Sequence, residues 1–405
     1  MSIVLMPHQE QCVNFHLLHQ YSLNGSGMGV GKTAIALEFM RRTGKMGLVV
    51  GPAFLEGTWL AEGEKFNFTD FKYIPYSQIH NYTEKDLNKY GVWVADESHY
   101  LKNPKAKRTQ CYYNLLKKVK PKYWAGLSGT PIKNKVFDLW VPLAICSQCP
   151  DNSNGLRLTG EHTKYYSFAR HFCHSEMLRV RNARIEKFGS VKEDKVPELK
   201  ALLKDKYIRF SLDDVAESLP EMVEKDVFLN LKPVKGLEET FNNYMAGSKV
   251  DPTSKAASAL LKVQSTVEYV EDLLEYGESV LIFSDHVAAA ETIAEKLNGI
   301  AITGKTDSSR RHILVDQFQE GRLKVISATI GSLSVGVTLT KARHVVFNDL
   351  SWTHSDNQQA KARIHRIGQK RACVAHYILA SETDFYIKKT LEQKAKTVLK
   401  VLGHE

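Results

Sequence analysis

The chain has 405 residues, of which 43% are hydrophobic and 25% are charged, and its formal net charge at pH 7 is +10. This length predicts two or three domains, and the composition is that of a globular protein, which excludes a disordered or fibrous chain. The positive charge favours a polyanionic partner, although many basic proteins bind no nucleic acid.

Short apolar runs alternate with amphipathic segments in two separate blocks. In the first block we expect a helix at Thr33–Arg41 and strands at Leu48–Val50, Val92–Ala95 and Tyr123–Leu127. In the second we expect a helix at Ala288–Leu297 and strands at Val280–Phe283, Val325–Ser327, His344–Asn348 and Val374–Ile378. Apolar strands alternating with helices are typical of a parallel sheet covered on both faces. The sequence therefore predicts an α/β chain with two lobes, residues 1–230 and 231–405.

The stretch between the two blocks is polar and basic, and we interpret it as helical. Leu199, Leu202 and Leu203 form a helical stripe after Pro197, which suits a first helical turn. A second helical stretch covers residues 237–276. We expect both to be protrusions, one on the first lobe at about residues 151–220 and one on the second lobe.

A glycine-rich loop precedes the first predicted helix. It reads Gly25-Ser26-Gly27-Met28-Gly29-Val30-Gly31-Lys32-Thr33. Glycines let backbone N–H groups turn toward phosphate, and the helix N-terminus adds positive potential. We expect Lys32 to neutralise the β- and γ-phosphates of ATP and Thr33 to hold Mg²⁺. The strict pattern has glycine where Ser26 stands, so the Gly-Lys-Thr end separates this loop from an ordinary flexible one.

An acidic pair, Asp96-Glu97, ends the predicted strand Val92–Ala95. A carboxylate at the carboxyl end of a parallel strand faces the crevice in which such sheets bind ligands. We expect Asp96 to hold Mg²⁺ through water and Glu97 to orient and deprotonate the attacking water. Alone, such a pair is usually a solvated turn, and its place about 60 residues after a Gly-Lys-Thr loop favours catalysis.

Three longer motifs resemble those of SWI/SNF-type translocases of helicase superfamily two. They are Asp96-Glu97-Ser98-His99-Tyr100-Leu101-Lys102-Asn103, Leu127-Ser128-Gly129-Thr130-Pro131 with Trp140 downstream, and Gln359-Ala360 followed by Arg363-x-His365-Arg366-Ile367-Gly368-Gln369. Weaker matches extend the resemblance from about Leu5 to Thr397. Segments between Tyr165 and Pro220 are similar to the insertion of the annealing-helicase, fork-remodelling subgroup. Ser332, Leu333 and Ser334 depart from the family, which usually has paired glycines there.

The resemblance implies two RecA-like lobes with parallel sheets and a role for further residues. Gln9 is the expected adenine contact, and Gly336 and Gln359 are expected to line the nucleotide. Arg363 and Arg366 are the expected arginine fingers at the γ-phosphate; the alternative is a solvated basic helix. Ser128 and Thr130 are the expected coupling residues between nucleotide and nucleic acid, rather than a simple turn.

The resemblance also implies a grip on the phosphate backbone of double-stranded DNA, for which branched or forked DNA is a candidate, by a monomeric motor. The candidate contacts are Lys102, Asn103, Lys105, Lys107, Arg108 and Trp352, with the basic stretch Arg179, Arg181, Arg184 and Lys187. The ordinary alternative for each is a solvated face. Grip by cations and amides predicts sequence-independent binding that weakens steeply with salt.

Two other functions remain open at this stage. One is a strand-separating DNA or RNA helicase, against which the Leu-Lys-Asn and His-Arg-Ile-Gly-Gln extensions argue. The other is a non-catalytic nucleic-acid-binding module with a degenerate motor. The ATP-site residues are all present and argue against it: Lys32, Asp96, Glu97, Arg363 and Arg366.

The six cysteines are sparse, which disfavours a disulfide framework and indicates a reducing compartment. Cys146, Cys149, Cys173 and His174 could supply four zinc ligands, although ordinary thiols are the simpler interpretation. We find neither a signal peptide nor an apolar run long enough for a membrane helix, and therefore expect an intracellular protein of the cytoplasm or nucleoid.

Overall fold

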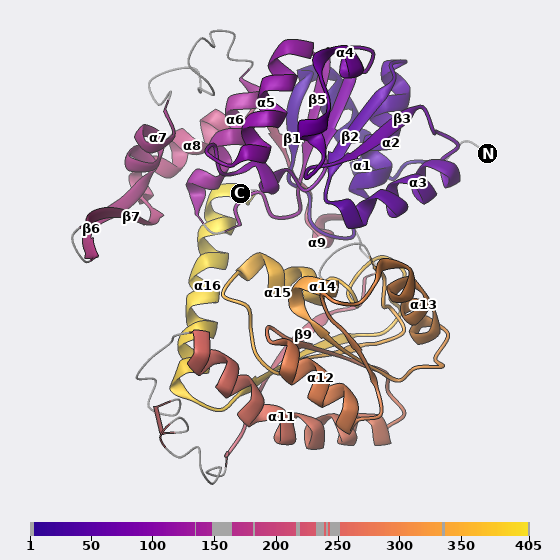
Figure 1. The fold of residues 1–405 in the computed structure, drawn as a ribbon, viewed down its shortest axis with the longest axis vertical. Coiled ribbons are helices and arrows are strands. Elements are labelled where there is room, and N and C mark those ends of the chain that lie inside the picture. The colour runs from indigo at the N-terminus through magenta and orange to yellow at the C-terminus, as the bar shows by residue number, and fades with distance from the viewer. Residues whose placement is uncertain are drawn as a thin grey trace. The chain divides into compact units, whose positions relative to one another are not determined.

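The computed structural model describes residues 4–133, 135–147, 164–180, 183–215, 219–231, 239, 242–243, 252–333 and 337–403. The chain forms two compact units (Figure 1). Lobe 1 comprises residues 1–215 and 396–405, and lobe 2 comprises residues 216–395. The expected boundary at residue 230 therefore differs from the division between the units, which lies between Val215 and Ala216.

Lobe 1 is built on a sheet of six parallel strands in the order β3-β2-β4-β5-β1-β8. The strands are β1 (Tyr21–Asn24), β2 (Gly47–Gly51), β3 (Phe71–Pro75), β4 (Val92–Ala95), β5 (Tyr123–Leu127) and β8 (Tyr207–Ile208). All residues of β2 and β4 are buried, as expected for strands that helices cover on both faces.

The helices of lobe 1 connect these strands. They are α1 (Pro7–His19), α2 (Lys32–Thr43), α3 (Glu56–Lys65), α4 (Glu84–Leu87), α5 (Lys107–Val119), α6 (Trp140–Cys146), α7 (Tyr165–Phe172), α8 (Val196–Leu203) and α9 (Leu212–Val215). Short 3₁₀ turns are η1 (Ala53–Leu55), η2 (Ile79–Asn81), η3 (Ser98–Leu101), η4 (Val136–Leu139) and η5 (Glu193–Lys195). Their ends follow local chemistry: α1 begins at Pro7, and α2 ends at Gly44 with a left-handed φ of 62°.

The protrusion of lobe 1 corrects our helical prediction for residues 151–220. Its helices α7 and α8 flank an antiparallel hairpin of β6 (Cys173–Val180) and β7 (Ala183–Val191), which extends away from the sheet (Figure 1). Leu178 pairs with Ile185 and both are exposed; Arg179 follows Leu178, and Arg184 and Glu186 flank Ile185, so apolar and charged side chains alternate over these few residues. The alternation has a period of two, which favours strands, and the polarity of the segment hid this pattern. Residues 148–163 lie outside the described part of the chain.

Lobe 2 is built on a second sheet of six parallel strands, in the order β11-β12-β10-β13-β14-β9. Its strands are β9 (Met222–Phe228), β10 (Val280–Ser284), β11 (Ile300–Ile302), β12 (Val325–Thr329), β13 (His344–Phe347) and β14 (Cys373–Leu379). Its helices are α11 (Pro252–Glu275), α12 (Val287–Lys296), α13 (Ser308–Gln319), α14 (Ile330–Leu333), α15 (His354–Lys361) and α16 (Glu382–Leu402), whose last turns are assigned to lobe 1.

These sheets confirm the predicted α/β class with two parallel-sheet lobes. Each expected strand is present, and α11 confirms the later part of the helix expected at residues 237–276, whereas residues 244–251 lie outside the described chain. Within the described residues, no helix is both long and apolar enough to cross a membrane.

Candidate nucleotide site

The register of the lobe 1 sheet brings three loops to one edge. Val50 pairs with Ala95, Ala95 with Gly126, and Leu127 with Asn24, so the carboxyl ends of β2, β4, β5 and β1 are level. The glycine-rich loop leaves β1, the acidic pair leaves β4, and the Ser128–Thr130 segment leaves β5. Sequence motifs far apart in the chain therefore meet at the edge where parallel sheets bind ligands.

The glycine-rich loop has a backbone that only glycine adopts readily. Gly29 and Gly31 have φ values of 82° and 85°. A Cβ on Gly31 would lie 2.4 Å from Nε2 of Gln9, which places the expected adenine contact beside the loop. Gln9 is held there because its Nε2 donates to the Val30 carbonyl and its Oε1 accepts from the Met6 N–H.

Lys32, the first residue of α2, reaches back across the loop. Its Nζ donates to the carbonyl oxygens of Gly27, at 2.8 Å, and Ser26, at 3.0 Å. Thr33 follows on the first turn of α2 and is partly exposed. The ammonium group therefore lies at the mouth of the loop, where the helix N-terminus also favours an anion.

A segment from far along the chain completes the loop, and no local sequence pattern predicts this contact. Gly25 N–H donates to Ile208 O, and Gly27 N–H donates to Phe210 O at 2.7 Å. Phe210 N–H in turn donates to Ser26 Oγ at 3.0 Å. A Cβ on Gly25 would lie 2.0 Å from the Tyr207 hydroxyl, so this glycine is required by packing. Tyr207 and Ile208 belong to the stretch between Tyr165 and Pro220, for which the sequence predicts an insertion and no place at the nucleotide loop.

Asp96 is buried at the end of β4 and is held in a fixed orientation. Its Oδ2 accepts from Trp59 Nε1 at 2.7 Å, and its Oδ1 accepts from the Glu97 N–H at 2.9 Å. Burial raises the pKa of Asp96, the charge of Glu97 raises it further, and Trp59 and Lys32 oppose the shift. A buried carboxylate beside a second, partly exposed one suits a divalent cation, so the donor set fits Mg²⁺.

Glu97 connects the acidic pair to the loop after β5. It has a left-handed φ of 48°, and its Oε2 lies 3.1 Å from Nδ1 of His99. A hydrogen bond of 2.9 Å joins the same Nδ1 to Ser128 Oγ, and Ser128 Oγ accepts from the Thr130 N–H at 3.2 Å. The structure thus brings both expected coupling residues to the expected base. His99 connects Glu97 to Ser128, and the sequence alone predicts no role for it.

In lobe 2, the two expected arginine fingers lie side by side. Nη1 of Arg363 and Nη1 of Arg366 donate to the same acceptor, the Val337 carbonyl, at 3.0 Å and 3.2 Å. Arg363 Nε also donates to the carbonyl of Gln359, which is buried on α15. Gly336 lies outside the described residues. The backbone therefore orients both guanidinium groups.

The expected nucleic-acid contacts are more scattered. Lys102 Nζ lies 3.6 Å from an Asp138 carboxylate oxygen, and Lys187 pairs with Glu176, so these four charges partly cancel. The other candidates have varied surroundings. Asn103 accepts a hydrogen bond from the Lys105 N–H, and the side chains of Lys105 and Arg108 lie over the rings of Tyr166 and Tyr100. Lys107 is exposed at the start of α5, Arg179 is opposite Arg184 in the strand register of the hairpin, and Lys255 lies over the ring of Trp352.

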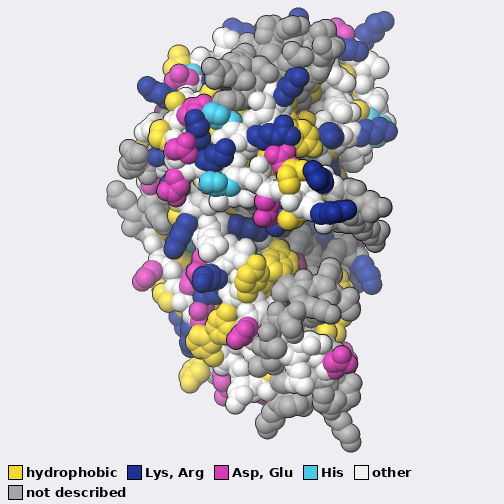
Figure 2. Space-filling model, turned by 90° about the vertical axis from the view of Figure 1, so that its left-hand side faces the viewer, with side chains coloured by type: hydrophobic (Ala, Val, Ile, Leu, Met, Phe, Trp, Pro, Cys, Tyr) yellow, Lys and Arg dark blue, Asp and Glu magenta, His cyan; other side chains and the backbone are white. Residues whose placement is uncertain are grey.

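Arg181 lies outside the described residues. Figure 2 shows Lys and Arg side chains spread over the side of lobe 1 that carries the hairpin, among a few acidic and histidine side chains. Cations are therefore present on this side of lobe 1.

The suggested zinc ligands do not form a described site. Cys146 and Cys173 are buried in the lobe 1 core, and Cys149 lies outside the described residues. Within the described part of the chain, no group of three or more His, Cys, Asp or Glu side chains could hold a metal ion.

Comparisons with known proteins show which family the chain belongs to. The SNF2-related domain matches residues 65–277, and the helicase conserved C-terminal domain matches residues 265–368. The "SWI/SNF-related matrix-associated actin-dependent regulator of chromatin subfamily A-like protein 1" of Xenopus laevis is 28% identical over 444 residues, covering 98% of this chain and 44% of that protein. The "DNA annealing helicase and endonuclease ZRANB3" of Mus musculus is 28% identical over 451 residues, covering 97% and 40%.

A solved structure, the Sulfolobus solfataricus SWI2/SNF2 ATPase core in complex with dsDNA, has 21% sequence identity and a TM-score of 0.44, and the match covers 100% of this chain and 94% of that one. The chain spans less than half the length of the frog and mouse relatives. Because a single family domain matches more than half of its residues, the chain belongs to the SNF2-related family.

Proposed function

We propose that this chain is an ATP-driven translocase on double-stranded DNA. Membership of the SNF2-related family implies ATP hydrolysis, and the DNA dependence is the proposal. The observation that carries it is the meeting of Lys32, Asp96, Glu97 and Ser128 at one edge of a parallel sheet. That arrangement links the hydrolytic groups to the loop through which nucleic acid would be sensed.

Each part has a chemical role in this proposal. Lys32 and the loop from Gly27 to Gly31 bind the phosphates, Thr33 and Asp96 hold Mg²⁺, and Gln9 contacts the adenine. Bound Mg²⁺ supplies positive charge for the phosphate oxygens. Glu97 orients water and accepts its proton, which suits a carboxylate kept in place by its backbone and by His99.

Lobe 2 supplies the groups that stabilise the transition state. Arg363 and Arg366 are the proposed fingers, and such a residue contributes about 10³–10⁵ in rate in related phosphoryl-transfer enzymes. Gln359 and Gly336 line the nucleotide in the same proposal. Because the base and the fingers belong to different lobes, hydrolysis requires the lobes to close, and repeated closure is a source of movement along a nucleic-acid backbone.

Double-stranded DNA is favoured over other partners by the net charge of +10 and by the relatives' names, one of which is a DNA annealing helicase. The proposed contacts are Lys102, Asn103, Lys105, Lys107, Arg108 and Trp352, with the hairpin cations as additional candidates. Contacts of this type are made to phosphates and do not read bases.

The test is an ATPase assay on the full chain with linear duplex, forked duplex, single-stranded DNA and RNA at several salt concentrations. We expect duplex DNA to stimulate hydrolysis most, with an effect that declines steeply with salt. Stimulation by RNA or single strands alone would instead support the helicase alternatives. Lys32→Ala should abolish the stimulated rate while Lys45→Ala, a change at an exposed lysine of the same lobe, leaves it intact. Equal rates for Lys32→Ala and the wild type would show that this is not the hydrolytic site.

A further inference from the structure

A basic hollow lies at the amino-terminal edge of the lobe 2 sheet. Its volume is about 540 Å³, and it is lined by residues that come just before four strands: Gly277 and Ser279 before β10, Lys324 before β12, Thr340 and Lys341 before β13, and Gly368, Gln369, Lys370 and Arg371 before β14. We call it the amino-edge hollow. Its position is opposite the carboxyl ends of the same strands, which α14 and α15 follow.

The lining of the amino-edge hollow selects for an anion. Four lining side chains are cationic, and none of the lining residues is acidic or has an apolar side chain. A site for an apolar ligand is lined mainly by hydrophobic and aromatic groups, so this lining excludes that class. Lysine and arginine side chains around a polar concavity are typical of phosphate recognition.

The cations keep most of their charge available. Among the described residues, Lys324, Lys341 and Lys370 form no ion pair. Glu278, which lies between the lining residues Gly277 and Ser279 in the sequence, is shared between Arg343 at 2.9 Å and Arg371 at 3.1 Å. One carboxylate therefore faces two guanidinium groups, and the three lysines add to the surplus of positive charge.

The loops that present Lys341 and Lys370 are fixed by side-chain amides. Gln369 is 7% exposed; its Nε2 donates to the carbonyls of Thr340 and Ala342, and its Oε1 accepts from the N–H groups of Lys370 and Arg371. Gln319 accepts from the Lys341 N–H at 2.9 Å. The two cationic loops are thus tied together, which lowers the entropic cost of binding a ligand between them.

We infer that the amino-edge hollow binds the phosphodiester backbone of a second nucleic-acid segment, such as another arm of a branched molecule. The inference rests on the proposed function for its choice of anion. The expected nucleotide and motor contacts of lobe 2 lie on α15, between α15 and β14, or directly after β13. None of the described ones lines the hollow, so a segment bound here is additional to the one that the motor follows.

The test compares binding of the full chain to a linear duplex and to a three-way junction with the same number of base pairs, without ATP. We expect the wild type to bind the junction more tightly and with a steeper dependence on salt, because more phosphates are contacted. The double variant Lys341→Glu/Lys370→Glu should lose about tenfold in junction affinity and less than about twofold in linear-duplex affinity. The matched control is Lys296→Glu/Lys389→Glu, which makes the same charge change at exposed lysines of lobe 2 outside the hollow.

An equal loss of junction affinity in the two double variants, or an equal loss for junction and linear duplex in the hollow variant, would overturn the inference. If the charge-reversed protein does not fold, as judged by circular dichroism, Lys341→Gln/Lys370→Gln takes its place, with an expected junction-specific loss of about threefold. Failure of the proposed function has a different signature, namely ATP hydrolysis that no nucleic acid stimulates, and the binding comparison does not depend on hydrolysis.

Discussion

Each lobe is built on its own six-stranded parallel sheet. The loop that leads from a strand into the following helix, however, carries opposite charge in the two lobes. In lobe 1, β1 leads into α2 through the glycine-rich loop, and Lys32 adds a positive charge at its mouth. In lobe 2, β10 leads into α12 through Asp285 and His286. There the carboxylate of Asp349 accepts hydrogen bonds from the Asp285 N–H and from the Ser284 hydroxyl.

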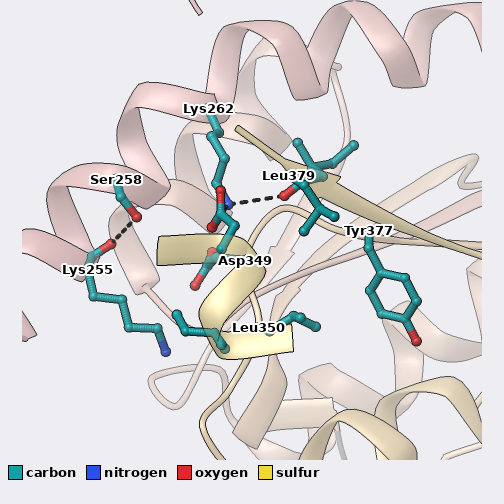
Figure 3. A pocket seen from close by; sticks show the side chains of 10 residues that line it. Lys255, Ser258, Lys262, Asp349, Leu350, Tyr377 and Leu379 are labelled. Atoms are coloured by element: carbon teal, nitrogen blue, oxygen red, sulfur yellow. Dashed lines mark hydrogen bonds and ion pairs between the residues drawn. The ribbon is translucent and has the colours of Figure 1, made fainter. Parts of the chain in front are cut away.

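The comparison teaches that topology alone does not make a triphosphate site. In lobe 2 the chain's own carboxylate occupies the place of an external anion, and the nearby ammonium groups are already paired. Lys255 lies 2.6 Å from Asp285, and the fully buried Lys262 lies 2.9 Å from Asp384. Figure 3 shows these α11 side chains and Asp349 around the small pocket that they line.

The largest expected effect on this difference between the lobes comes from removing Glu97, the proposed catalytic base of lobe 1. Glu97→Gln should lower the turnover number for ATP by about 10²–10⁴, because an amide cannot accept the proton of water. Nucleotide affinity, measured with a fluorescent analogue, should change little. Glu56→Gln, an exposed change in the same lobe, is the control. A turnover number within tenfold of the wild type would remove Glu97 from the proposed mechanism.

Lobe 2 should respond to loss of its internal pairing through its stability. Lys262→Met leaves the carboxylate of Asp384 buried without its ammonium partner, and we expect the free energy of unfolding to fall by about 3–5 kcal/mol in urea titrations. Lys262→Met/Asp384→Asn should recover most of this loss. Lys389→Met, on the exposed side of α16, should change the free energy by less than about 0.5 kcal/mol. Equal stability of Lys262→Met and the wild type would contradict the buried pair.

Two glycine substitutions in lobe 1 separate the cost of backbone strain from that of a collision at the glycine-rich loop. Gly44→Ala places a side chain at a φ of 62° in open space and should cost about 1–2 kcal/mol in stability, measured by thermal unfolding. Gly31→Ala adds a collision with Gln9 to a similar backbone cost, so it should also weaken ATP binding, measured by titration. Undiminished ATP affinity in Gly31→Ala would refute the close approach of Gly31 to Gln9 as a requirement for ATP binding.

The smallest expected effect concerns the contact between the loops of lobe 1. Ser128→Ala removes a hydrogen bond to His99 that is worth about 0.5–1.5 kcal/mol. The ratio of DNA-stimulated to unstimulated ATPase should therefore fall by about two- to tenfold. Ser147→Ala removes a hydroxyl that, within the described part of the chain, donates to a carbonyl of α6, and it should leave the ratio unchanged. Identical ratios in the two variants would separate Ser128 from coupling.

The sequence predicted those features that local chemistry determines. Buried strands such as Val92–Ala95 are short apolar runs, and the glycine-rich loop needs glycine because of its positive φ angles. The contact of His99 with Ser128 was not predictable in this way, because it depends on the register of β4 and β5. For the same reason, nothing in the run Met222–Phe228 assigns it to the sheet of lobe 2.

The β6–β7 hairpin was missed for a different reason. Its alternation of charged and apolar side chains is short and both of its faces carry exposed residues, so the pattern lacks the clear buried side of an ordinary strand. The nucleic-acid contacts were equally hard to select, because Lys102 and Lys187 have carboxylate partners that only the folded chain brings near.

The attachment of Phe210 to the glycine-rich loop has a consequence for synthesis of the protein. Phe210 and Ser26 are separated by 184 positions, so a nascent chain on the ribosome exposes the loop long before its closing strand has emerged. During that interval the N–H groups of Gly25 and Gly27 lack their acceptors in β8 and the residues that follow it. We therefore expect nucleotide capture to be a late event of translation, and an amino-terminal fragment that stops short of Tyr207 should not retain ATP.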